Sequence, residues 1–71
     1  MNKKINISIV GTGLMGLQHI KAISKSKKAN LHSIVDISNT AKNLSKKYKI
    51  PLYSNVNELL NSKNLDAVIV A

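Results

Sequence analysis

Three closely spaced glycines near the start of the sequence restrict what this chain can fold into more than any other feature. They form the pattern G-x-G-x-x-G over residues 11–16, between the apolar run 5–10 and a segment with helical periodicity. In that setting Gly11 allows a tight turn, Gly13 lets the backbone approach a diphosphate, and Gly16 lets a helix pack closely on a strand. The pattern therefore predicts a strand, a phosphate-binding turn and a helix, in that order.

The rest of the chain continues to alternate between strand and helix patterns. Helical periodicity covers residues 14–26; Ser38 can cap a second helix, which Pro51 ends; and Asn55 with Glu58 resembles a capping box for a third. The predicted strands are residues 5–10, 31–35, 51–53 and 65–71. This order, βαβαβαβ, predicts an α/β fold: part of a doubly wound parallel sheet of the Rossmann type with right-handed crossovers, truncated after the fourth strand.

The first predicted strand departs from the pattern of a fully buried strand. Its isoleucines alternate with Asn6 and Ser8, whereas a parallel strand covered on both faces is usually apolar throughout. We expect these two polar residues to affect the stability of the sheet but not the glycine turn.

A carboxylate follows the second predicted strand at the spacing that a dinucleotide site requires. Asp36 lies 20 residues after Gly16, where an acidic side chain can accept hydrogen bonds from the adenosine ribose hydroxyls. Its charge would repel a 2′-phosphate, and neither Ile37 nor Ser38 is an arginine that could attract one. We therefore expect NAD in preference to NADP. The alternative is that Asp36 only opens a turn or caps the second helix.

The predicted cofactor site combines the glycine turn with the ends of two strands. Backbone N–H groups at the start of the first helix, from Leu14 and Met15, would face the phosphates with the positive end of the helix dipole. The Met15 side chain could contact the cofactor or simply pack at the edge of the turn. We assign cofactor binding to Gly11, Thr12, Gly13, Leu14, Met15, Gly16, Asp36, Ile37 and Ala71.

The histidines and the absence of cysteine bear on catalysis and metal binding. A histidine can be a general base or a metal ligand, but His19 has no acidic neighbour in sequence and no second histidine at helical spacing. We interpret His19 and His32 as structural, and we predict no catalytic residue and no metal site in this chain. With no cysteine, disulfides and thiolate sites are excluded, which fits a cytoplasmic location.

The formal net charge of +8 would suit an anionic partner such as a nucleic acid. All eleven basic residues are lysines, however, and arginine is better suited to bidentate contacts with bases and phosphates. Lysines spread over solvated helix faces explain the charge, so we expect no nucleic-acid partner. The apolar runs fall far short of the roughly 20 residues of a membrane-spanning helix, and we expect no membrane association.

The length of 71 residues limits the core that this chain can build on its own. We expect residues 1–71 to be the N-terminal part of a dinucleotide-binding domain, with a substrate domain absent from the chain. The closing apolar run 67–71 is typical of a strand inside a sheet. In isolation, such a chain is expected to fold marginally at best.

The sequence resembles a known family over its whole length. The most specific part is segment 10–19, which reads V-G-T-G-L-M-G-L-Q-H and is similar to the start of the glucose-fructose oxidoreductase and inositol dehydrogenase family, Gfo/Idh/MocA. Further on, the segments 35–36, 53–55, 58–60 and 65–71 resemble that family's successive landmarks.

The resemblance implies an oxidoreductase that transfers hydride between NAD(P) and a sugar, a cyclitol or a related hydroxyl or carbonyl substrate. It also implies a small-molecule substrate domain in the full-length protein, for which we expect a homo-oligomer. The family's catalytic lysine, in an E-K-P segment, and a later histidine would lie beyond Ala71, and Ala71 itself would border the nicotinamide ribose. The alternative is a nucleotide-sensing module, which would keep the glycine turn and Asp36 but lack acid-base residues. A lysine-rich nucleic-acid binder would instead show steeply salt-dependent affinity.

Overall fold

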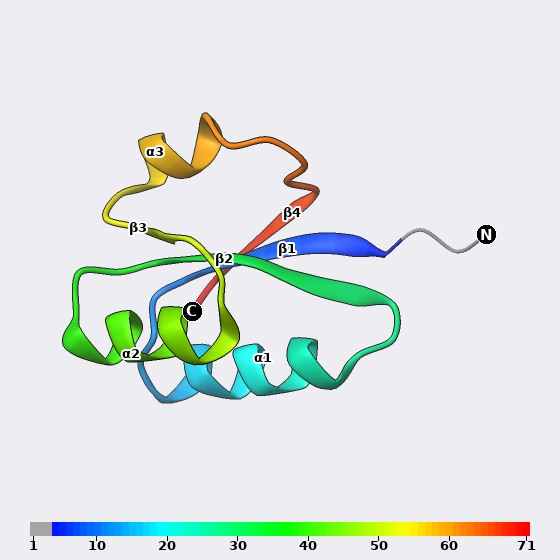
Figure 1. Cartoon of the computed structure of the whole chain (residues 1–71), viewed down its shortest axis with the longest axis horizontal. Helices are drawn as coiled ribbons and strands as arrows, with labels where there is room; N and C mark the ends of the chain where they lie inside the picture. The colour runs from blue at the N-terminus through cyan, green and yellow to red at the C-terminus, as the bar shows by residue number, and fades with distance from the viewer. Residues whose placement is uncertain (1–3) are drawn as a thin grey trace.

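The computed structural model describes residues 4–71 and consists of one parallel sheet with helices on both faces. Four strands lie in the order β3-β2-β1-β4. In chain order the elements are β1 (Ile5–Val10), α1 (Leu14–Lys25), β2 (Ala29–Val35), α2 (Asn39–Tyr48), β3 (Leu52–Tyr53), α3 (Val56–Leu60) and β4 (Ala67–Val70). Figure 1 shows α1 and α2 on one side of the sheet and α3 on the other. The predicted α/β class and βαβαβαβ order are therefore confirmed.

Three of the strands have bounds that differ from the prediction, and β3 differs only in starting at Leu52 instead of residue 51. β2 begins at Ala29 instead of residue 31, because the Ile5 N–H donates to the Lys28 carbonyl and the two strands are paired from Ile5 and Ala29 onward. β4 covers only Ala67–Val70 of the predicted range 65–71. Pairing with β1 sets both limits, so the local apolar pattern alone could not define them.

Side-chain caps start two of the three helices. The Ser38 hydroxyl accepts a hydrogen bond from the Ala41 N–H at 3.1 Å and begins α2, and the Asn55 side chain accepts one from the Glu58 N–H at 2.9 Å and begins α3. Both N-caps are as predicted, since Ser and Asn satisfy N–H groups that the first helical turn leaves free. The expected capping box is only half formed, because the Glu58 carboxylate accepts from the Ser54 N–H instead of the Asn55 N–H. α2 ends at Tyr48, and the next residue, Lys49, closes the helix in a left-handed conformation (φ 56°).

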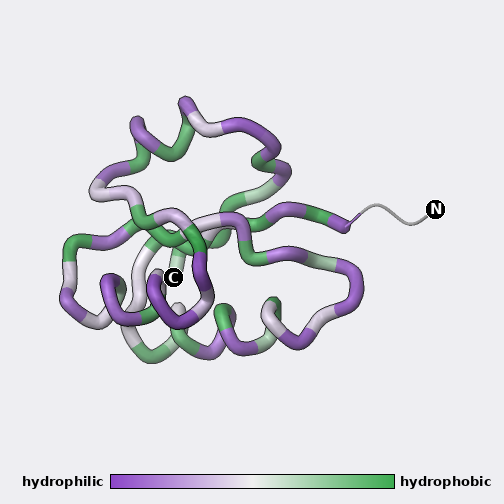
Figure 2. The backbone as a smooth tube through the Cα atoms, in the orientation of Figure 1, coloured by the Kyte–Doolittle hydropathy of each residue, from purple (hydrophilic) through white to green (hydrophobic). Residues whose placement is uncertain are grey.

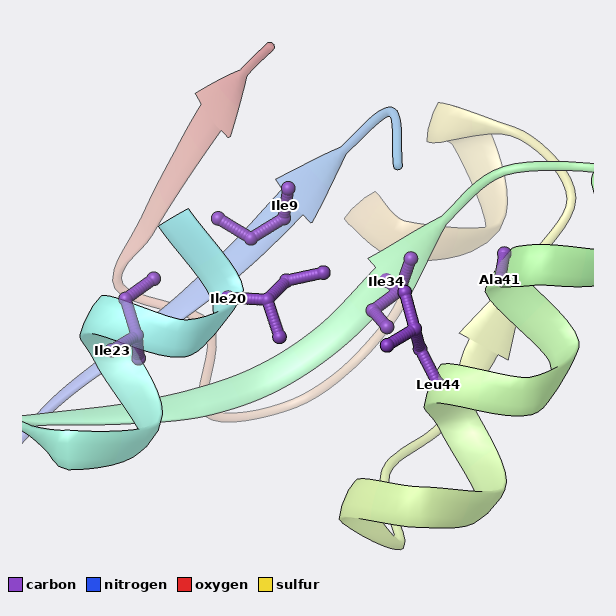
Figure 3. Close-up of a cluster of buried hydrophobic side chains, with 6 residues drawn as sticks. All are labelled: Ile9, Ile20, Ile23, Ile34, Ala41 and Leu44. Carbon is purple, nitrogen blue, oxygen red and sulfur yellow. The ribbon is translucent and has the colours of Figure 1, made fainter. Parts of the chain in front are cut away.

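The main core lies between the sheet and the helix pair α1 and α2. In Figure 3, Ile20 of α1 lies between Ile9 on β1 and Ile34 on β2, Leu44 of α2 lies beside Ile34, and Ile23 belongs to the same cluster. Each fully buried isoleucine of this kind contributes about 1.5–3 kcal/mol relative to an exposed one. This packing fixes α1 over the end of β1 and so determines where the glycine turn sits.

The opposite face of the sheet holds a chain of polar groups beneath α3. Ser8 and Ser33 are fully buried, and the Ser33 hydroxyl donates to the Ser8 hydroxyl at 2.9 Å. The register between β1 and β2 shifts at Ser8, so that His32 is an extra residue on β2. Its two ring nitrogens lie 2.8 Å from the Ser33 hydroxyl and 2.9 Å from the Lys63 carbonyl. Both ring nitrogens of His32 are therefore used in hydrogen bonds within the fold.

The other polar residue of β1 is also satisfied. The Asn6 side-chain oxygen accepts a hydrogen bond from Asn30, and the Asn6 backbone exchanges hydrogen bonds with the carboxylate and the N–H of Asp66. Among residues 4–71, every buried side-chain nitrogen or oxygen has a partner. The polar residues of β1 are thus compatible with a buried strand because β2 and the approach to β4 supply their hydrogen bonds.

Polar and apolar residues separate as the packing requires. Figure 2 shows hydrophobic and hydrophilic colour alternating along the helices and hydrophilic colour over much of the connections. Each lysine from Lys4 onward is exposed. Within residues 4–71, no helix is both long and apolar enough to cross a membrane, and no three His, Asp or Glu side chains gather as a metal site would require.

Candidate functional site

The glycine turn lies where the carboxyl ends of three parallel strands meet. The Gly11 N–H donates to the Val35 carbonyl at the end of β2, and the Ala71 N–H donates to the Val10 carbonyl at the end of β1, both at 2.9 Å. These bonds bring residues 11, 36 and 71 to one edge of the sheet. In open α/β sheets this edge is where ligands bind.

Two of the three glycines are needed by the structure of the turn itself. Gly11 has φ 99°, a left-handed conformation that side chains rarely adopt. At Gly16 an added Cβ would overlap the Gly11 carbonyl oxygen and would lie 2.9 Å from the Gly11 carbonyl carbon. α1 can therefore cross this close to the turn only because residue 16 has no side chain.

Gly13 differs from the other two glycines because nothing in the chain occupies the space around it. An added Cβ would meet no atom within 4 Å, and the backbone, at φ −66° and ψ −168°, is one that any residue could adopt. Gly13 is also the N-cap of α1 and provides no side-chain hydrogen bond, unlike Ser38 and Asn55 at the other two helices. The first N–H groups of α1 are thus uncapped by the Gly13 position and lie at the positive end of the helix dipole.

The Asp36 carboxylate is tied to the glycine turn. One of its oxygens accepts hydrogen bonds from the Thr12 N–H at 2.8 Å and from the Thr12 hydroxyl at 2.5 Å. The other oxygen accepts the N–H groups of Ile37 at 2.7 Å and Ser38 at 3.2 Å. The Thr12 hydroxyl is the main cause that lowers the pKa of Asp36 below its ordinary value of 3.8; partial burial opposes this, and the three N–H groups reinforce it. Asp36 is therefore held as an anion beside the turn.

Exposed apolar side chains surround the turn. Leu14 is 74% exposed, Met15 58% and Ile37 80%, although all three are large hydrophobic residues. Ala71 lies against the turn from the β4 side: its carbonyl oxygen would be 3.0 Å from a Cβ at Gly11, and its methyl group 3.5 Å from one at Gly16. The structure thus brings all the predicted site residues to one place. His32 lies within β2, and His19 lies within α1, one turn after Met15.

One relationship within the site was not predicted. The Thr12 hydroxyl lies 3.2 Å from the Ser38 hydroxyl as well as 2.5 Å from Asp36, so three side chains from two loops form one cluster. The sequence shows a hydroxyl residue inside the glycine pattern and another two positions after the acid, but their pairing across 24 residues follows only from the sheet register.

The family profile described as "Oxidoreductase family, NAD-binding Rossmann fold" (Gfo/Idh/MocA) matches residues 5–71. No match among curated protein sequences was found. Among solved structures, an NAD-binding protein from Listeria innocua is 28% identical, with a TM-score of 0.80 over 97% of this chain and 20% of its own. Scyllo-inositol dehydrogenase from Lactobacillus casei, solved with NAD(H) and scyllo-inositol, is 24% identical, with a TM-score of 0.86 over 97% of this chain and 21% of its own.

A third structure, named as an NADPH-dependent oxidoreductase from Desulfitobacterium hafniense, is 19% identical, with a TM-score of 0.86 over all of this chain and 21% of its own. The chain thus spans about a fifth of the length of these solved structures. The two structures below 25% identity show the shared fold, and the family profile covers the glycine turn, Asp36 and all four strands. The chain belongs to the Gfo/Idh/MocA oxidoreductase family and forms part of its NAD-binding Rossmann domain.

Proposed function

We propose that residues 11–16 bind the diphosphate of NAD and that Asp36 binds its adenosine ribose. The observation that carries this proposal is the free space at Gly13, at the start of a helix that no side chain caps. A diphosphate could approach these N–H groups directly, and the helix dipole would stabilise its charge. A β-carbon at residue 13 would fill the space that the phosphates need.

The residues on either side of the glycine turn fit the parts of NAD that flank its diphosphate. Ile37, exposed directly after Asp36, offers an apolar surface on the ribose side, and Ala71 borders the turn from the β4 side. The anionic Asp36 favours NAD over NADP, because a 2′-phosphate would bring a second negative charge to a carboxylate whose pKa is already lowered. Sequence identity of 28% to an NAD-binding protein from Listeria innocua supports the same preference.

We further propose that the full-length protein is an oxidoreductase that acts on a sugar, a cyclitol or a related hydroxyl or carbonyl compound. Family membership and the fold shared with scyllo-inositol dehydrogenase support this substrate class. The bound nicotinamide would supply or accept the hydride, and residues 11–16 and Asp36 would orient it. A sensor module would share the same cofactor site, so hydride transfer by the full-length protein with a panel of polyols separates the two functions.

The cofactor site is tested by titrating the full-length protein with NADH and following nicotinamide fluorescence. Gly13→Val should abolish binding at concentrations that saturate the wild type, because its side chain occupies the phosphate space. Gln18→Val, at an exposed position further along α1, is the matched control and should bind normally. Asp36→Ala should weaken NADH binding about 10- to 100-fold, because charged hydrogen bonds to the ribose are lost. The difference in affinity between NADH and NADPH should also become smaller. Normal titration of Gly13→Val would refute the site.

A further inference from the structure

We propose that Thr12 determines cofactor preference indirectly, by positioning the Asp36 carboxylate, and does not contact the cofactor through its own side chain. This inference rests on the proposed function, since it assigns a role to a residue within the same site. It adds to that proposal a positioning role: the Thr12 side chain holds Asp36 in place and does not itself touch the cofactor.

The exposure of Thr12 contrasts with that of its neighbours in the turn. Thr12 is only 7% exposed, while Gly13, Leu14 and Met15 are all exposed on the open side of the turn. Its side chain therefore points into the protein, toward the end of β2. A side chain in this position cannot reach a ligand lying over the N-terminus of α1 without displacing Asp36.

The donors and acceptors around Thr12 allow only one direction for its hydrogen bonds. An ionised carboxylate can only accept, so the Thr12 hydroxyl proton must point to Asp36. The contact with Ser38 then requires the Ser38 hydroxyl to donate to Thr12, while Ser38 accepts from the Ala41 N–H at 3.1 Å. The N-cap of α2, the glycine turn and Asp36 thus form one directed chain.

The other donors to Asp36 do not replace Thr12. Three of its four hydrogen bonds come from backbone N–H groups, two of which belong to the residues directly following it. The Thr12 hydroxyl is the one side-chain donor among the four, and it donates to the same Asp36 oxygen as the Thr12 N–H. Without it, that oxygen keeps a single bond, and the carboxylate gains freedom to turn away from a ribose.

The consequence is a selective effect on the two cofactors. NADH binding would have to reorder the Asp36 side chain, a cost that corresponds to about a three- to tenfold weaker affinity. NADPH would lose nothing, because a carboxylate that can turn away repels the 2′-phosphate less. A residue that touched the diphosphate would instead change the affinity for both cofactors equally, since they share that group.

The test measures the dissociation constants of NADH and NADPH for the full-length protein carrying Thr12→Val, which replaces the hydroxyl by a methyl group of similar size. We expect NADH affinity to fall about three- to tenfold with NADPH affinity unchanged or improved. Thr12→Ser should restore wild-type values, because it keeps the donor. Thr12→Ala, measured in parallel, should reproduce the valine result and replaces it if the valine variant does not fold.

The decisive measurement uses the double variant Thr12→Val with Asp36→Ala and compares its cofactor affinities with those of Asp36→Ala alone. If Thr12 acts through Asp36, the second change has no further effect on either cofactor. A further loss of NADH affinity in that background, an equal loss for both cofactors, or unchanged NADH affinity in the single variant overturns the inference. These results leave the proposed site intact as long as the wild type binds NADH, whereas a wild type that binds neither cofactor refutes the proposed function and this inference with it.

Discussion

Replacing Gly16 by alanine sets two physical effects of opposite sign against each other. Residue 16 is in the first turn of α1, and alanine is favoured over glycine in a helix by up to about 1 kcal/mol. The added Cβ, however, would overlap the Gly11 carbonyl oxygen and lie 2.9 Å from its carbon, where ordinary contacts are 3.4–4 Å. The backbone at Gly11 cannot move away easily, because the Gly11 N–H is hydrogen-bonded to the Val35 carbonyl at the end of β2.

The magnitude follows from how far the helix must move. Restoring ordinary contact requires a shift of roughly 1 Å in a closely packed region, and overpacking of this kind costs about 1–3 kcal/mol. We therefore expect Gly16→Ala to destabilise this segment despite the better helix propensity. Gly13→Ala is the matched control: with nothing within 4 Å and an ordinary backbone conformation, it should change stability by no more than about 0.5 kcal/mol.

Hydrogen–deuterium exchange with peptide mass spectrometry is the suitable assay, because it reports on β1 and α1 whatever else the full-length protein contains. A loss of 1–3 kcal/mol corresponds to exchange about 5- to 150-fold faster in peptides from residues 5–25. Wild-type or slower exchange in Gly16→Ala would show that the contact relaxes without cost, and the packing argument would be wrong. Faster exchange in Gly13→Ala would equally contradict the structural distinction between the two glycines.

Two further predictions concern the polar groups of the sheet and of the site. Because the folded state lowers the pKa of Asp36, its ionised form stabilises the fold above the unfolded value of about 3.8, and this contribution is lost as the pH falls through the lower folded value. Below about pH 3.8, the free energy of unfolding should therefore fall less steeply with decreasing pH in Asp36→Asn than in the wild type. Equal pH dependence in the two proteins would show that Asp36 makes no such contribution. Ser8→Ala and Ser33→Ala should each cost about 1–2 kcal/mol, while the double variant should cost less than their sum, because the two hydroxyls satisfy each other. Strict additivity in urea unfolding would contradict that pairing.

The sequence was most informative where the cause of a structure lies within a few residues. The glycine turn, the Ser38 and Asn55 caps and the position of Asp36 after a strand all depend on local chemistry, and the structure has each of these elements where the sequence predicted it. Spacing alone placed Asp36 near the turn, since the end of a parallel strand brings its following residue to the same edge as its neighbours.

Features that depend on strand pairing could not be predicted in this way. Ala29 and Asn30 have no strand pattern of their own, and they become strand because β1 lies beside them. The sequence favoured a structural role for His32 but gave no partner for it; the ring contacts the Ser33 hydroxyl and the Lys63 carbonyl, at the register shift between β1 and β2. Similarly, Thr12 matched an unspecified position of the glycine pattern. Its bond to Asp36 depends on how two strand ends meet.

The exposed side of β4 affects how this chain behaves by itself in solution. β4 lies at the edge of the described sheet, and on the face opposite Ile69 its residues Val68 and Val70 are 39% and 79% exposed. A free strand edge with apolar side chains favours edge-to-edge aggregation. The net charge of +8 opposes it by mutual repulsion, which salt screens over about 10 Å at 0.1 M ionic strength. Low ionic strength should therefore keep the isolated chain dispersed, and added salt should promote its precipitation.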